Sequence, residues 1–70
     1  MTRKDYELIA TAIRESRDYF SWIYDHDKDR EILTATAVGH LTSKLIMALS
    51  QENPKFNSEI FRKACGLEIN

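Results

Sequence analysis

Hydrophobic residues recur with helical spacing over the first third of the chain. Thr2 is a suitable N-cap, and Asp5 stands three residues later, where a carboxylate favours a helix N-terminus. We expect a helix from Thr2 to Tyr24, although Arg17 interrupts its apolar stripe and an end near Arg17 or Asp18 is the alternative. At 100° per residue the stripe comprises Tyr6, Ile9, Ala10, Ile13, Phe20, Ile23 and Tyr24.

A second helix is predicted over residues 28–52. The polar segment 25–31 before and within its start is interpreted as a connection followed by an acidic first turn. Two stripes suggest a central helix that touches two neighbours. Gly39 lies in the stripe of mostly small residues, which would let a partner helix approach closely. The first stripe comprises Thr34, Ala37, Val38, Leu41, Leu45, Ala48 and Leu49; the second comprises Ile32, Thr36, Gly39, Ser43 and Ile46.

A short third helix has the clearest boundary signals. The Asn-Pro pair at residues 53–54 ends the second helix, because proline cannot continue it. Asn57 is then a good N-cap, and Phe56 and Phe61 have the spacing of a hydrophobic staple. Gly66 is placed to end this helix in the left-handed conformation.

These elements predict an all-α fold in a single domain over residues 1–70, with two longer antiparallel helices and a short C-terminal one. Two glycines and one proline leave little material for hairpins. Domains of this length seldom draw more than roughly 3–5 kcal/mol of stability from one core. We therefore expect the chain to add core by forming a homodimer.

Composition narrows the class of protein. Ten Lys and Arg against eleven Asp and Glu give a formal charge of −1, which favours neither nucleic acid nor a membrane surface as partner. No uninterrupted apolar run approaches the roughly 20 residues of a membrane span, and the N-terminus does not resemble a signal peptide. Cys65 is the single cysteine, which suits a reducing cytoplasm.

The connection carries three aspartates at alternate positions, the first three ligand positions of a calcium loop. The pattern then fails, because Arg30 replaces the required glycine and Thr36 the bidentate glutamate. We interpret this segment as a solvated capping loop; the aspartates are Asp25, Asp27 and Asp29.

No residues have the spacing of a metal or catalytic site. His26 and His40 are fourteen residues apart and Cys65 is much further on, unlike the short spacings of zinc ligands. Cys65 precedes a helix-ending glycine, where the helix dipole raises a thiol pKa, so we interpret it as a packed structural residue. We expect no catalytic residues, no metal, no cofactor and no enzymatic activity.

Four of the seven aromatic residues fall within residues 19–24. In a helix, these side chains and Ile23 would span more than half the circumference, more than one neighbouring helix can cover. Two interpretations stay open: a local core cluster, or an exposed surface that anchors another protein, as Trp and Tyr often do. The predicted partner-binding residues are Leu8, Tyr19, Trp22, Tyr24, Asp25 and Asp27.

The second helix, the turn and the third helix have the outline of a helix-turn-helix. A recognition helix presents basic and amide side chains, whereas the outward positions here include Glu59 as well as Arg62 and Lys63. We favour an ordinary helical corner, and keep a dimeric nucleic-acid binder as an alternative. Its contact surface would be the third helix, or the side formed by Arg3, Lys4, Arg14 and Arg17.

Both ends of the chain resemble small, largely uncharacterised proteins of bacteriophages and prophages. The resemblance lies in TRKDYELIA at residues 2–10 and in ENPKF at residues 52–56, followed by Phe61 and Ala-Cys-Gly at residues 64–66. It covers about half of the chain and implies an origin, with no catalytic or binding residues to carry over.

Together these observations predict a non-enzymatic accessory protein of phage type that binds another protein in the bacterial cytoplasm. A host or defence-system protein that it inhibits is the expected target. A nucleic-acid-binding regulator and a purely structural homo-oligomer are the alternatives.

Overall fold

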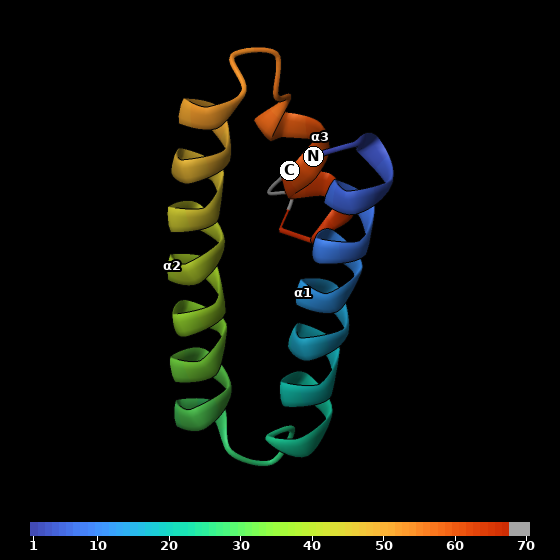
Figure 1. Ribbon diagram of the computed structural model, residues 1–70. Coiled ribbons are helices and arrows are strands. Elements are labelled where there is room, and N and C mark those ends of the chain that lie inside the picture. The colour runs from blue at the N-terminus through green and yellow to red at the C-terminus, as the bar shows by residue number, and fades with distance from the viewer. Residues whose placement is uncertain (68–70) are drawn as a thin grey trace.

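In the computed structural model, which describes residues 1–67, the chain forms a helical hairpin closed at one end by a short third helix (Figure 1). Helix α1 spans Arg3–Ile23, α2 spans Lys28–Glu52 and α3 spans Ser58–Ala64. The all-α prediction is confirmed, with two long helices and a short one, and the first helix continues past Arg17.

Each helix begins at a side-chain cap. Thr2 and Asp5 form a reciprocal capping box, in which the Asp5 amide donates to Thr2 Oγ1 at 3.3 Å and the Thr2 amide to Asp5 Oδ2 at 3.0 Å. Asp27 caps α2 through the Arg30 amide at 3.2 Å. Asn57 caps α3 in the same way, as the sequence predicts. These caps satisfy amides that a helix start leaves without intrahelical partners.

The end of α3 is also fixed by local chemistry. Gly66 has φ +77°, and its amide donates to the Lys63 carbonyl while the Leu67 amide donates to the Arg62 carbonyl, both at 3.0 Å. This pair of bonds is the Schellman motif, which turns the chain back after a helix. Residues 65–67 therefore return to α1.

The core lies where α3 covers the hairpin. One polar side chain, that of Thr42, is fully buried in this core. Its hydroxyl donates a hydrogen bond to the Val38 carbonyl at 2.8 Å, so the buried polar group is satisfied. The Phe56 and Phe61 rings are 5.4 Å apart between centroids, which confirms the staple. The buried hydrophobic residues are Ala10, Ile13, Ile46, Leu49, Phe61 and Cys65.

The predicted packing of α2 is partly wrong. The buried residues of α2 lie between the two predicted stripes. The side of each stripe that faces away from them is therefore mostly exposed. The expected close approach at Gly39 is also wrong, because a Cβ there would meet no atom within 4 Å. The reason is that α1 and α3 share one side of α2. The exposed stripe members are Ile32, Thr36, Ala37, Leu41, Ser43 and Ala48.

Arg17, which interrupts the apolar stripe of α1, connects α1 to the end of α3. Its Nη1 donates a hydrogen bond to the Gly66 carbonyl, 49 residues further along the chain. The side chain is half-buried, and its Nε is shielded from solvent. A hydrogen bond from a charged donor contributes about 1.5–3 kcal/mol to the free energy of unfolding. The polar residue that interrupts the stripe is therefore the one that makes a tertiary contact.

We expect opposite effects when an alanine replaces each glycine. Gly39→Ala should raise the free energy of unfolding by up to about 1 kcal/mol, because glycine disfavours a helix interior and the space beside it is open. Gly66→Ala should lower it by about 1–2 kcal/mol, because its φ is positive and the new Cβ would lie 3.0 Å from Arg17 Nη1. Urea titration followed by circular dichroism measures both, and equal effects of the two changes would contradict this account.

Candidate functional site

The aromatic side chains near the connection between α1 and α2, at the end of the hairpin away from α3, divide into an exposed pair and an inner pair. Tyr19 and Trp22 are 53% and 75% exposed, and their ring centroids are 6.5 Å apart. We call these two side chains the aromatic patch. The exposed interpretation of the cluster therefore holds for two of its four aromatic residues.

The inner pair, Phe20 and Tyr24, is structural. Their rings are nearly parallel, with centroids 6.2 Å apart, and both residues are half-buried. The Arg30 guanidinium lies 6.0 Å from the centre of the Tyr24 ring, within the range of a cation–π contact. Tyr24, a predicted partner-binding residue, thus packs the two long helices together where they meet.

The predicted acidic residues of the loop also have local roles. Asp27 caps α2, and its Oδ2 lies 3.4 Å from Arg30 Nε. Asp25 lies beside the exposed His26, with 3.9 Å between Oδ2 and Nε2. Two further exposed carboxylates, Glu15 and Asp18, are four residues before Tyr19 and Trp22, so helical spacing places them on the same side of α1. The patch consequently has an acidic rim, of which the sequence predicted the loop carboxylates but not Glu15 and Asp18 on α1.

Leu8 is exposed, but it lies away from the patch. Eleven residues of helix separate it from Tyr19, a distance of about 16 Å along the axis. The structure does not bring Leu8 together with the other predicted partner-binding residues.

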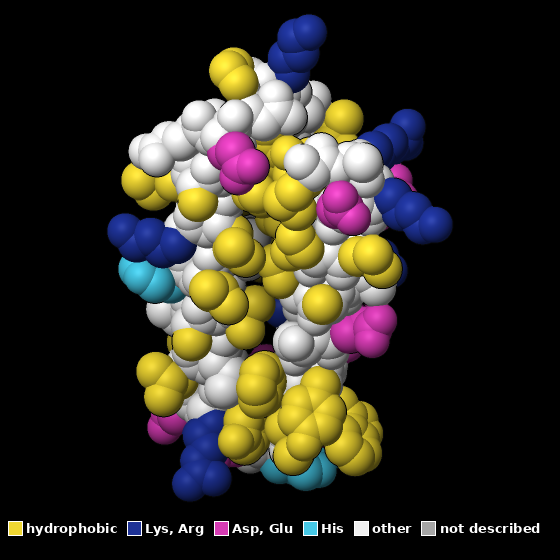
Figure 2. Space-filling view, in the orientation of Figure 1, with side chains coloured by type: hydrophobic (Ala, Val, Ile, Leu, Met, Phe, Trp, Pro, Cys, Tyr) yellow, Lys and Arg dark blue, Asp and Glu magenta, His cyan; other side chains and the backbone are white. Residues whose placement is uncertain are grey.

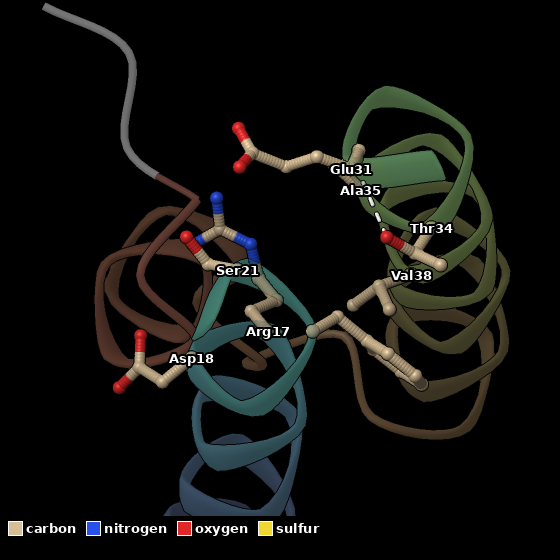
Figure 3. A pocket seen from close by; sticks show the side chains of 8 residues that line it. Arg17, Asp18, Ser21, Glu31, Thr34, Ala35 and Val38 are labelled. Atoms are coloured by element: carbon tan, nitrogen blue, oxygen red, sulfur yellow. Dashed lines mark hydrogen bonds between the residues drawn. The ribbon is translucent and has the colours of Figure 1, made fainter. Parts of the chain in front are cut away.

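A small groove lies between α1 and α2 beyond the reach of α3 (Figure 3). Its volume is about 180 Å³, below the roughly 300–1,000 Å³ typical of ligand pockets. Arg17 and Glu31 extend over its mouth from opposite helices (Figure 3), and Glu31 pairs with Lys28 at 3.7 Å. The other lining residues are Asp18, Phe20, Ser21, Thr34, Ala35 and Val38.

A second hollow, of about 520 Å³, lies among the start of α1, the turn after α2 and α3. Tyr6 and Phe56 contribute its aromatic wall, with 5.0 Å between ring centroids, and Arg3 pairs with Glu7 at its edge at 3.2 Å. Among residues 1–67 there is no cluster of three His, Cys, Asp or Glu side chains able to hold a metal ion.

Cys65 is fully buried in the core, and burial raises the pKa of its thiol, with the positive charge of Arg17 opposing that shift. The thiolate is the reactive form of cysteine, so a raised pKa and lack of access both make the side chain inert. Its placement agrees with the structural interpretation.

Three of the four basic residues of the nucleic-acid alternative, Arg3, Lys4 and Arg14, are exposed, and some of the four make contacts within the chain. Arg17 is half-buried and bonded to Gly66, and Arg3 is paired with Glu7. Arg14 packs against the end of α3, where its Cγ would lie 3.4 Å from a Cβ at position 66. Two of the four are thus engaged in polar contacts within the chain.

By length and composition, α2 is apolar enough to cross a membrane, the one such helix within residues 1–67. The core helix of a water-soluble protein passes the same test, so the finding is weak evidence for a span. Little of this apolar stretch is buried, which means that α2 carries more hydrophobic surface than the rest of the chain covers.

Comparisons of the chain with protein-family models, with curated proteins and with solved structures found no match.

Alanine substitution of an exposed and of an inner aromatic residue should have different effects on the free energy of unfolding. Trp22→Ala should change the free energy of unfolding by less than about 0.5 kcal/mol, because the side chain is largely in solvent. Tyr24→Ala should lower it by about 1–3 kcal/mol through loss of the contacts with Phe20 and Arg30. Thermal unfolding by circular dichroism measures both; a large loss with Trp22→Ala would place the indole in the core.

The Cys65 thiol should react with a maleimide or disulfide reagent only when the chain unfolds. At pH 8 we expect labelling to be at least tenfold slower in buffer than in denaturant, because burial disfavours the thiolate and blocks access. Mass spectrometry of timed samples measures the rates. Equal rates would show that the end of α3 opens readily.

Proposed function

We propose that this chain is a non-enzymatic accessory protein of phage type that binds another protein in the bacterial cytoplasm. The observation that carries the proposal is the exposed Tyr19–Trp22 pair. Large aromatic side chains that project from a rigid helix lose little entropy on binding, and Trp and Tyr are enriched among residues that dominate interface energy. The resemblance of both chain ends to phage proteins supports the proposed origin.

The acidic rim indicates the chemistry of the partner. Glu15 and Asp18 flank the patch on α1, and Asp25 follows it in the loop. A complementary surface would offer an apolar pocket for the indole with Lys or Arg around it, since complementary charges speed encounter and exclude other partners. A host or defence-system protein whose active surface has this character would be blocked by occupation of that pocket.

A tagged pull-down from bacterial host lysate, with and without nuclease, tests the proposal. A host protein should be retained after nuclease treatment, and Trp22→Ala should reduce its capture at least tenfold. Ile60→Ala is the matched control, because Ile60 is 65% exposed but lies on α3 at the other end of the hairpin. Mass spectrometry identifies and quantifies the captured proteins.

Three outcomes would contradict the proposal. Equal capture by Trp22→Ala and the wild type would remove the aromatic patch as the binding site. Recovery of nucleic acid, or loss of partners on nuclease treatment, would favour the nucleic-acid alternative. Capture of this chain alone would favour a purely structural homo-oligomer.

A further inference from the structure

The hairpin leaves one long face apolar and uncovered by α3. The end of α3 packs on the side of α1 that carries Arg14 and Arg17, and helical spacing places the apolar residues on the opposite flank. Figure 2 looks onto this flank, where hydrophobic side chains run over both long helices and charged ones lie toward the edges. We call it the apolar face, and its main members are Ala12, Ile23, Ala37, Leu41, Leu45 and Ala48.

The side of the molecule that carries the apolar face is large enough for a stable dimer interface. The molecule measures 41 × 20 × 18 Å, so one long face has an outline on the order of 800 Å². Standard protein–protein interfaces bury about that area on each partner. Burial of the face would therefore supply the additional core that a chain of this length lacks.

Charges at the two ends of α2 indicate the orientation of the partner. Arg30 lies near the start of α2 and Glu52 at its end, and both are exposed on the apolar-face flank. A two-fold axis across the helices at Leu41 brings Glu52 of one copy to Arg30 of the other, twice, because both are eleven residues from Leu41. An axis parallel to the helices would instead bring Glu52 to Glu52 and Arg30 to Arg30 of the other copy, and like charges repel.

Side-chain sizes fit the same register. With Leu41 on the axis, Leu45 faces Ala37 of the other copy, and Ala48 faces Thr34. Leu45 thus meets a small side chain, Ala48 and Thr34 are both small, and only the two Leu41 side chains bring large groups together at the axis. This arrangement permits the interaxial distances of about 8–10 Å seen for packed helices. An isologous contact of this kind closes on itself as a dimer.

We propose that a second copy of this chain covers the apolar face, with α2 against α2 in antiparallel orientation and Leu41 at the two-fold axis, to form a four-helix bundle. The proposal does not rest on the proposed function, because it needs only the apolar face and the charges at the two ends of α2. Trp22 is turned about 100° around α1 from Ile23, so the indole stays accessible at both ends of the dimer, whereas Tyr19 lies at the edge of the apolar face. A lipid surface is the other occupant that an apolar face could have, and the experiment distinguishes it.

Sedimentation velocity of the full chain at 1–100 µM tests the proposal. We expect a mass of 16.4 kDa, twice the 8.2 kDa of one chain. Leu41→Lys should raise the dimer Kd at least tenfold, whereas Met47→Lys should leave it within threefold. Met47 is the matched control, because it lies on the same helix with nearly the same exposure, 55% against 56%, but on another side.

A charge exchange tests the orientation. Arg30→Glu and Glu52→Arg should each raise the Kd. The double variant should bind more tightly than Arg30→Glu alone, because it restores opposite charges across the axis, whereas the contacts of Arg30 with Asp27 and Tyr24 within the chain are lost in both variants. Circular dichroism should show wild-type helix content in every variant.

A monomer throughout the concentration range, or a dimer insensitive to Leu41→Lys, would overturn the proposal. Absence of recovery in the double charge variant would overturn the antiparallel register. Binding of a monomeric wild type to phosphatidylglycerol vesicles, lost in Leu41→Lys, would show that lipid covers the face instead.

Discussion

The length of α3 governs how this fold distributes its buried surface. Seven residues of helix span about 10 Å, whereas the 25 residues of α2 span about 37 Å. The third helix can therefore cover only the end of the hairpin where it docks, and the buried hydrophobic residues gather there around Phe61 and Cys65. Toward the connection at residues 24–27, two helices must protect their apolar side chains without a third layer.

The contacts that hold α3 in place connect the extremes of the sequence. The Schellman motif returns the chain so that the Gly66 carbonyl accepts a hydrogen bond from Arg17. That bond replaces the apolar contact that the stripe of α1 lacks at position 17, and it lies beside the buried Cys65. Beyond it, the Phe20–Tyr24 stack and the Arg30 guanidinium close the other end of the hairpin. Stability is thus built from two separate clusters, a mixed aliphatic and aromatic core beneath α3 and an aromatic stack near the connection between the long helices.

The features that sequence reasoning predicted well are those determined by a few neighbouring residues. The caps at Thr2 and Asn57, the stop at residues 53–54 and the left-handed Gly66 each depend on chemistry within about four positions. The buried side of α2 could not be predicted in the same way, because two stripes of similar hydrophobicity compete and the choice depends on where α3 docks. In the candidate site, periodicity left Leu8, Tyr19 and Trp22 outside the apolar stripe of the first helix, and all three are exposed in the structure. Periodicity could not show that Arg30 contacts both the Tyr24 ring and the Asp27 carboxylate. Neither a cation–π contact nor an ion pair produces a periodic pattern in the sequence.

The two uncovered surfaces differ in a way that suits different partners. The aromatic patch is small and projects into solvent with carboxylates around it, so it resembles the anchor of a heterologous contact. The apolar face is long and has opposite charges at its two ends, which is the pattern of a self-complementary interface. Because Trp22 is turned about 100° around α1 from Ile23, burial of the apolar face would leave the indole of each aromatic patch free. A dimer would then carry two aromatic patches at opposite ends of one rigid bundle, and bivalent attachment raises the apparent affinity of each without any new contact.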